Sequence, residues 1–304
     1  MAESNLVQLV QEIKNKSTDI KQTHDIFKFH SAQITFELLN QNHWCHYAFQ
    51  DSLDKLISMI EMNFNSIETF GLVSTTRYLF ELNIRLTLIE QDPRYGLAYY
   101  GQLLRDQVSY WKSLKEQLDR EVEFLKALDL EEKVLHDAKL LELLKVEEPK
   151  LQEAMAAKLT TDTFNIIDSK AARKFSIHAE QARTNGYAFQ SFLIQKNQLP
   201  EVTSSLAEVE REYDSYKSAV QQDILKIIKN WNWKQKAIET NHFFEYDYIY
   251  SFTSRMLHAT PANITTNYKF LSRDEILIFL KYINVKLTDI VELSNKFITN
   301  PMKL

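Results

Sequence analysis

Glycine and proline are scarce along this chain: 4 glycines and 5 prolines occur among 304 residues. Folds that are rich in turns need many of both, because glycine supplies positive φ and proline fixes the first position of a turn. Apolar residues recur at spacings of three and four through most of the sequence, which predicts long amphipathic helices. The sequence therefore predicts an all-α fold, and the glycine count also excludes repeated glycine-rich phosphate loops.

The helical pattern shows no repeat period, no low-complexity tract and no clear linker, so we expect a single all-helical domain over 1–304. Within it, 105–160 is rich in Leu, Glu and Lys, which predicts a helical hairpin that forms an arm or an insertion. Pro149 marks a helix start or a break there. Further helices are expected over about 165–195, over about 199–231 after Ser/Thr caps, and from a capping box formed by Ser272 and Glu275.

Charge and cysteine content exclude several classes of protein. The formal net charge is −5, whereas a bulk nucleic-acid binder usually carries a strong basic excess, although a small site acting on RNA stays open. The single cysteine, Cys45, excludes an internal disulfide framework and a multi-cysteine zinc site. No apolar run approaches the roughly 20 residues that span a bilayer, and the N-terminal segment is too charged for a secretory signal. We expect a cytoplasmic protein without membrane contact.

The stretch YIYSFTSRMLHATP gathers chemically useful side chains just before Pro261. On an ideal helix with about 100° per residue, Tyr250, Ser254 and His258 share one face, with Arg255 beside them and apolar residues opposite. A solvated face is the ordinary explanation, and the helix dipole explains a histidine near a helix C-terminus. Solvated faces usually favour Glu and Lys, however, so this composition also fits a working site.

A second constellation is a charged stripe on an otherwise apolar helix. Arg77, Glu81 and Arg85 are spaced by four in STTRYLFELNIRL. Charges on a largely buried helix are costly unless they are paired. Two interpretations stay open: a chain of intrahelical ion pairs, or an arginine that Glu81 holds and aims at an anion such as a phosphate.

Other candidates are weaker. His43, Cys45 and His46 are close in sequence, but residues at i, i+2 and i+3 do not converge well on a helix, so we expect no metal and no other cofactor. Trp231 and Trp233 fit packing or a turn anchor better than a platform for stacking bases.

Two stretches of the chain resemble the signatures of a bacterial all-helical domain family of unknown function. STTRYLFELNIRLTLIEQDPRYG looks like the first, in which an Arg and then Phe-Glu lie on a helix that ends near Asp-Pro. WNWKQKAIETNHFFEYDYIYSFTSRMLHATP looks like the second, which has a Tyr, a Ser four later and a His four after that. That family resembles the HEPN superfamily of helical-bundle ribonucleases and nucleotide-binding proteins. The likeness covers about 30–270.

The resemblance implies a HEPN-like bundle, a homodimer, and a metal-independent ribonuclease or toxin-type effector in bacterial antiphage defence. His258 would act as general base or acid, since its unperturbed pKa suits both roles near neutrality. Arg77 would bind the phosphate and Glu81 would orient Arg77. The substrate-contacting residues would be Tyr250, Ser254, Arg255 and Arg85.

The chain departs from the ribonuclease motif in one respect. Active HEPN ribonucleases carry an Arg that is followed, after four to six residues, by the His; here 251–253 read Ser, Phe and Thr, and Arg255 is too close to His258. The departure, the acidic balance and the Leu/Glu/Lys arm favour an alternative: a non-catalytic sensor or interaction subunit that contacts a partner protein through the arm. Arg77, Glu81 and Tyr250 would then belong to a buried polar network with His258. A small-nucleotide-binding pocket is a third interpretation.

Overall fold

The computed structural model describes residues 2–65, 68–258 and 270–300, and every regular element in these ranges is helical. The all-α prediction is therefore confirmed. The chain divides into two compact units: residues 1–103 with 216–304, which we call the bundle unit, and residues 104–215, which we call the arm unit. No helix in the described ranges combines the length and apolar character needed to cross a lipid bilayer.

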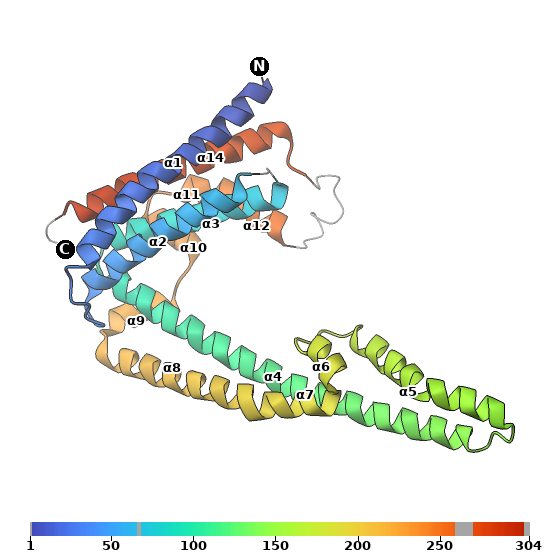
Figure 1. Ribbon diagram of the computed structural model, residues 1–304. Helices are drawn as coiled ribbons and strands as arrows, with labels where there is room; N and C mark the ends of the chain where they lie inside the picture. Colours follow the sequence, from blue (N-terminus) through green and yellow to red (C-terminus); the bar gives the residue numbers. More distant parts are fainter. Residues whose placement is uncertain (1, 66–67, 259–269, 301–304) are drawn as a thin grey trace. The chain divides into compact units, whose positions relative to one another are not determined.

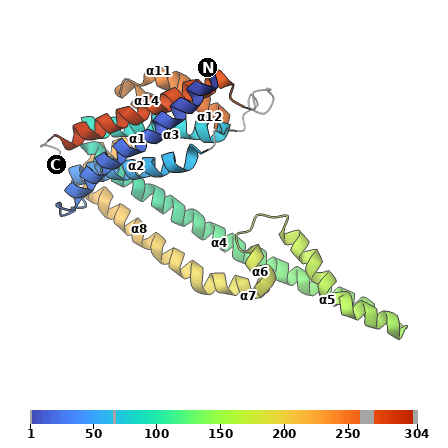
Figure 2. The same cartoon turned by 45° about the horizontal axis from the view of Figure 1, so that its top comes forward.

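Four long helical segments dominate the bundle unit (Figure 1). Helix α3 packs against α14 and α2, and α1 packs against α2 and α14, so the four helices enclose one core. In both views α1 and α14 lie side by side (Figure 1 and Figure 2). The bounds are α1 Ala2–Ser31, α2 Gln41–Asn63, α3 Thr69–Gln91 and α14 Arg273–Ile298.

Aromatic stacking fills this core. The ring of Phe297 lies 4.6 Å from that of Phe49 and 6.2 Å from that of Phe27, measured between centroids. All three rings are buried, and burial of a phenylalanine side chain contributes about 1.5–3 kcal/mol. Helix α14 begins with the expected capping box: Ser272 accepts from the backbone N–H of Glu275, and Glu275 accepts from that of Ser272.

Shorter helices pack against α3 to complete the bundle unit. After α9 (Gln222–Lys229) and α10 (Trp233–Glu239), one continuous helical run is formed by α11 (Phe243–Glu245), the π-helical turn η2 (Tyr246–Tyr250) and α12 (Ser251–Leu257). Both η2 and α12 contact α3. The proline expected to stop this helix, Pro261, lies outside the described residues.

The arm unit is built on α4 (Arg94–Leu143), which starts in the bundle unit and passes into the arm unit without a break. Helix α5 (Pro149–Ala171) folds back along the far part of α4 to form a hairpin (Figure 2). Pro149 is at the start of α5, where its missing N–H costs nothing. The expected arm, 105–160, falls inside this unit, which continues to residue 215. An unbroken helical pattern in α4 gives the sequence no mark of the boundary.

The single helix expected over 165–195 is wrong, because the chain turns twice there. Helix α5 ends at Ala171, and α6 (Ala179–Asn185) and α7 (Tyr187–Leu193) are separated by Gly186 with φ 89°. Buried Glu121 on α4 fixes the first turn, since its carboxylate accepts from the Ser176 hydroxyl and the His178 backbone N–H.

The capped helix start expected near residue 199 is also absent. The π-helical turn η1 (Ile194–Gln198) joins α7 directly to α8 (Leu199–Ala219). The Leu199 N–H bonds to the Ile194 carbonyl, five residues back, just before Pro200. Proline has no N–H and clashes with the preceding turn, so widening the helix by one residue lets it continue.

Candidate functional site

Arg77 on α3 joins the two signature stretches. Its Nε donates to Glu81 Oε1 at 3.0 Å and its Nη2 donates to the Tyr250 hydroxyl at 3.3 Å. The guanidinium carbon also lies 4.8 Å from the centre of the Tyr250 ring. The side chains of Arg77 and Glu81 are only 22% and 27% exposed. Burial raises the pKa of Tyr250, so its hydroxyl stays protonated at neutral pH.

Arg85, two turns further along α3, repeats this arrangement. Its Nη1 donates to Gln102 Oε1 at 2.7 Å, and its guanidinium carbon lies 4.5 Å from the Trp231 ring centre and 5.1 Å from that of Trp233. The two tryptophans pack against the core, as the sequence indicated. The cavity beside Arg85 has a volume of about 10 Å³, which leaves room for about one water molecule and none for a nucleotide.

We call these residues the arginine seam: two guanidinium groups on α3, each lying on aromatic rings supplied by residues 231–250. A cation over an aromatic face contributes about 0.5–2 kcal/mol, depending on how far it is desolvated. The seam therefore ties α10 and η2 to α3. Its members are Arg77, Glu81, Arg85, Gln102, Trp231, Trp233 and Tyr250.

The face that an ideal helix would give to Tyr250, Ser254 and His258 is divided in the structure. Tyr250 is half-buried against α3 and Ser254 is half-buried, whereas Arg255 and His258 are exposed. Arg255 Nε donates to the Ser251 carbonyl of its own helix at 3.2 Å. Tyr250 ends η2 and the other three residues follow it. An ideal helix already turns by about 80° between Tyr250 and His258, and His258 caps α12 with an extended backbone.

An exposed stripe along α11, η2 and α12 was missed in the sequence. Phe244 and Tyr248 are exposed on the same run of helix as Arg255 and His258. The spacings of four, seven and three place these side chains near one line once the π turn is included. The available signal was a pair of aromatic residues, Phe244 and Tyr248, spaced by four on the same run of helix.

A polar cluster between α11 and α14 was also missed. Lys286 on α14 is buried, and its Nζ donates to Glu245 Oε1 and Asp289 Oδ2, both at 2.9 Å. The Tyr282 hydroxyl donates to Glu245 Oε2 at 2.7 Å. An i, i+3 pair on an amphipathic helix gives no sign in the sequence that it is buried.

A cavity of about 330 Å³ lies next to this cluster. Burial lowers the pKa of His242, which keeps its ring neutral at pH 7, and burial raises the pKa of Tyr282 far above its usual range. The volume falls within the range of small-molecule sites, but the lining is mostly polar and charged, whereas such sites are lined mainly by apolar side chains. Its lining residues are Asn83, Thr87, His242, Asp289, Glu292, Leu293 and Lys296.

The His43, Cys45 and His46 side chains turn to separate partners. His43 Nδ1 accepts the Glu37 backbone N–H at 2.9 Å, and buried Cys45 donates to the Pro93 carbonyl at 3.4 Å. His46 lies in the core beside Ser31. Across the part of the chain that the structure describes, no group of three or more His, Cys, Asp or Glu residues could hold a metal ion.

Comparison with known proteins gives no relative. No family model, no curated protein and no solved structure matches this chain. The HEPN likeness therefore stays a prediction drawn from the two signature stretches, and function has to be argued from the geometry of the chain itself.

Proposed function

We propose that this chain is a non-catalytic helical subunit that binds a partner protein through the arm unit. The observation that carries the proposal is a stripe of apolar side chains on the outside of α4. Leu130, Val134 and Leu141 follow one another at helical spacing and are 63%, 61% and 62% exposed. Large apolar side chains exposed along one face of a helix fit a site of protein interaction, although the exposed Asp137 lies between Val134 and Leu141.

Helix α5 of the same hairpin also leaves apolar side chains exposed. Its exposed apolar side chains include Leu151, Met155, Phe164 and Ile166. The arm unit also carries the entire net charge of the protein, because 104–215 contains 21 acidic and 16 basic residues while the bundle unit is balanced. An apolar surface within an acidic field favours a specific partner over indiscriminate aggregation.

The arginine seam supports a structural role for the signature residues. Arg77 already pairs with Glu81 and lies against Tyr250, and Arg85 lies on two tryptophans, so both guanidinium groups are committed to holding helices together. We further propose that the bundle unit is HEPN-like. The contact between Arg77 and Tyr250 supports this, because the resemblance expects its two signatures to meet.

The interaction proposal is tested by site-specific photo-crosslinking in the native host. A photoreactive residue at Leu141 should give a discrete heavier adduct. The same residue at Met62, which is exposed on α2 of the bundle unit, is the matched control and should give none. A chain that forms no adduct from Leu141 would rule out the interaction function.

A second candidate is the metal-independent ribonuclease or toxin-type effector, and the exposed stripe of α11–α12 favours it. Phe244 and Tyr248 offer faces for base stacking, Arg255 offers a cation for phosphate, and His258 offers an exposed imidazole as general acid or base. The implied homodimer would supply two such stripes.

This candidate is tested with purified chain and a single-stranded RNA. It requires cleavage that His258→Ala abolishes and binding that Tyr248→Ala weakens, with unchanged thermal stability in both variants. Intact RNA after prolonged incubation at high protein concentration would exclude the ribonuclease candidate, and the interaction function would be the one that stands.

A further inference from the structure

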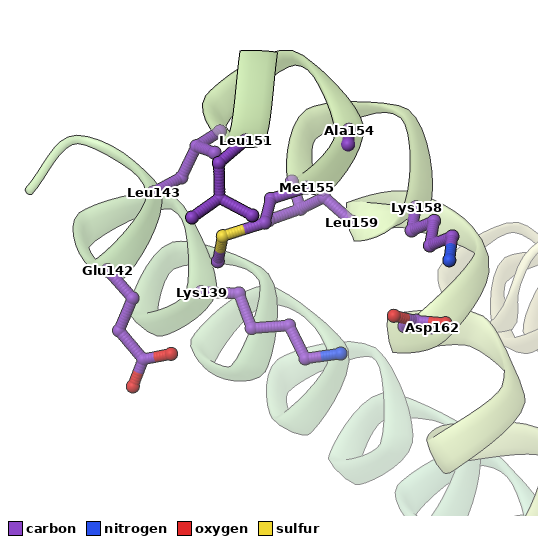
Figure 3. Close-up of a pocket in the computed structure, with 9 residues that line it drawn as sticks. All are labelled: Lys139, Glu142, Leu143, Leu151, Ala154, Met155, Lys158, Leu159 and Asp162. Carbon is purple, nitrogen blue, oxygen red and sulfur yellow. The ribbon is translucent and has the colours of Figure 1, made fainter. Parts of the chain in front are cut away.

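The hairpin of the arm unit opens into a cleft close to its turn. Figure 3 shows Leu143 of α4 beside Leu151 and Met155 of α5, with Lys158 and Asp162 at the far end. The cleft has a volume of about 320 Å³. Apolar side chains form its centre and charged ones its rim. The lining residues are Lys139, Glu142, Leu143, Leu151, Ala154, Met155, Lys158, Leu159 and Asp162.

The cleft exists because the first half of α5 has too little to pack against. The buried side chains of α5 are Thr163, Ile167 and Ala171, all in its second half, where the core of the arm unit begins. From Pro149 to Asp162 the residues of α5 are exposed or only half-buried. Two helices cannot cover both apolar faces here, whereas a third helix laid along the cleft would cover them.

Charge decides which kind of helix fits. The segment that surrounds the cleft, 129–162, contains nine acidic and five basic residues, which gives a net charge of −4. A second copy of the hairpin would bring two acidic segments together, and like charges at an interface are repulsive. A helix with basic residues flanking its apolar face has the complementary charge.

We propose that this cleft binds a basic amphipathic helix of another protein. Apolar side chains of that helix at i, i+3 or i+4, and i+7 would enter between Leu143 and Met155. The charged lining is balanced, with Lys139 and Lys158 beside Glu142 and Asp162, so the acidic excess of the surrounding segment 129–162 would attract the lysines or arginines of the helix. The result is a three-helix bundle at the end of the arm. This inference rests on the proposed function, because it names the chemistry of the partner that the arm binds.

The probe is a synthetic helical peptide of about 20 residues, long enough to form a stable helix, with leucine on one face and lysine elsewhere. A peptide with the same leucines and glutamate in place of lysine is its counterpart. Binding to the full chain is measured by fluorescence anisotropy. The lysine peptide should bind at least about tenfold more tightly than the glutamate peptide, and added salt should weaken it.

Two variants of the full chain locate the binding. Met155→Asp places a charge in the cleft, and Phe175→Asp adds the same charge at an exposed position of the arm unit outside the cleft. Met155→Asp should weaken the lysine peptide about tenfold or more beyond Phe175→Asp. Circular dichroism checks that both variants keep their helices. Equal binding of the two peptides, or equal effects of the two variants, overturns the proposal.

Sedimentation of the wild-type chain tests the competing occupant. A dimer that Met155→Asp dissociates would show that a second copy fills the cleft, which overturns the basic-helix proposal. The outcomes also separate this inference from the proposed function. If Leu141 forms its crosslinked adduct but the lysine peptide does not bind at the cleft, the partner chemistry is wrong and the interaction function stands.

Discussion

The two units of this chain are both built from amphipathic helices, but they differ in how much apolar surface they bury and in their charge. The bundle unit buries its aromatic residues in a stacked core and balances its charges, and it ties its helices together with the arginine seam. The arm unit buries a smaller cluster, carries the net charge of −5 and leaves apolar side chains exposed along α4 and α5. The difference teaches that amphipathic helices alone do not define a closed fold: the bundle unit encloses a large core, and the arm unit leaves a row of apolar side chains on α4 exposed.

The same contrast separates structural residues from functional ones. In the bundle unit the chemically versatile arginines of α3 hold neighbouring helices, so their side chains serve stability. In the arm unit, leucine and valine residues that look unremarkable in the sequence are exposed along α4. Substitutions that are matched between the units can break or sharpen this comparison.

The largest contrast comes from phenylalanine. Phe279 of α14 is fully buried in the bundle unit, so Phe279→Ala should lower the free energy of unfolding by about 3–5 kcal/mol. Phe175 of the arm unit is 82% exposed, so Phe175→Ala should change it by less than about 0.5 kcal/mol. Urea denaturation followed by tryptophan fluorescence and circular dichroism measures both. Similar losses from the two variants would contradict the contrast between the units.

The next largest effect is expected from the arginine seam. Arg77→Ala leaves the Glu81 carboxylate without its ion pair in a largely buried position and removes the cation over Tyr250, so we expect a loss of about 2–3 kcal/mol. Arg255→Ala, at an exposed position of the same unit, should cost less than about 0.5 kcal/mol. Thermal melting distinguishes the two. Unchanged stability together with lost RNA cleavage in Arg77→Ala would instead favour the catalytic interpretation.

Acid should destabilise the bundle unit through His46. Burial, assisted by the charges of His30 and His43, lowers the pKa of His46 to about 4. As the pH falls below the unfolded pKa of about 6.5, the unfolded chain takes up a proton that the folded chain refuses until about pH 4. The contribution of neutral His46 to the free energy of unfolding is therefore complete above about pH 6.5, and it declines as the pH falls towards 4.

We expect this group to account for roughly 1–2 kcal/mol of the stability lost between about pH 7 and pH 5. The measurement is the free energy of unfolding at both pH values in the wild type and in His46→Asn. The variant should be less stable at pH 7 but should lose less on acidification. An identical slope in the two proteins would show that His46 is not the group responsible.

The smallest effects come from two glycines whose added Cβ would meet no atom within 4 Å, so only the backbone decides. Gly71 lies inside α3 of the bundle unit, and Gly71→Ala should stabilise it by about 0.5–1 kcal/mol. Gly186 of the arm unit has φ 89°, so Gly186→Ala should cost about 1 kcal/mol. Opposite signs in thermal melting support this reading, and equal signs contradict it.

Local sequence patterns were sufficient for much of the fold. The spacing of apolar residues gave the helices, Pro149 gave the start of α5, and Ser272 with Glu275 gave the cap of α14. Each of these depends on residues within a few positions of one another, so the signal is present in a short stretch. The sequence patterns did not predict the turns at Ala171 and Gly186. The first of them depends on the buried Glu121, which comes from another helix.

The candidate site shows the same division. The pairing of Arg77 with Glu81 could be read from a spacing of four, because a helix places such residues on one face. The contact of Arg77 with Tyr250 joins residues 173 positions apart, and no spacing rule indicates that Tyr250 is half-buried while His258 is exposed. The sequence by itself thus determined that this chain is helical and where its charges lie. Only the tertiary structure decided which charges are buried as a seam and which apolar faces stay open, because burial depends on how distant helices pack.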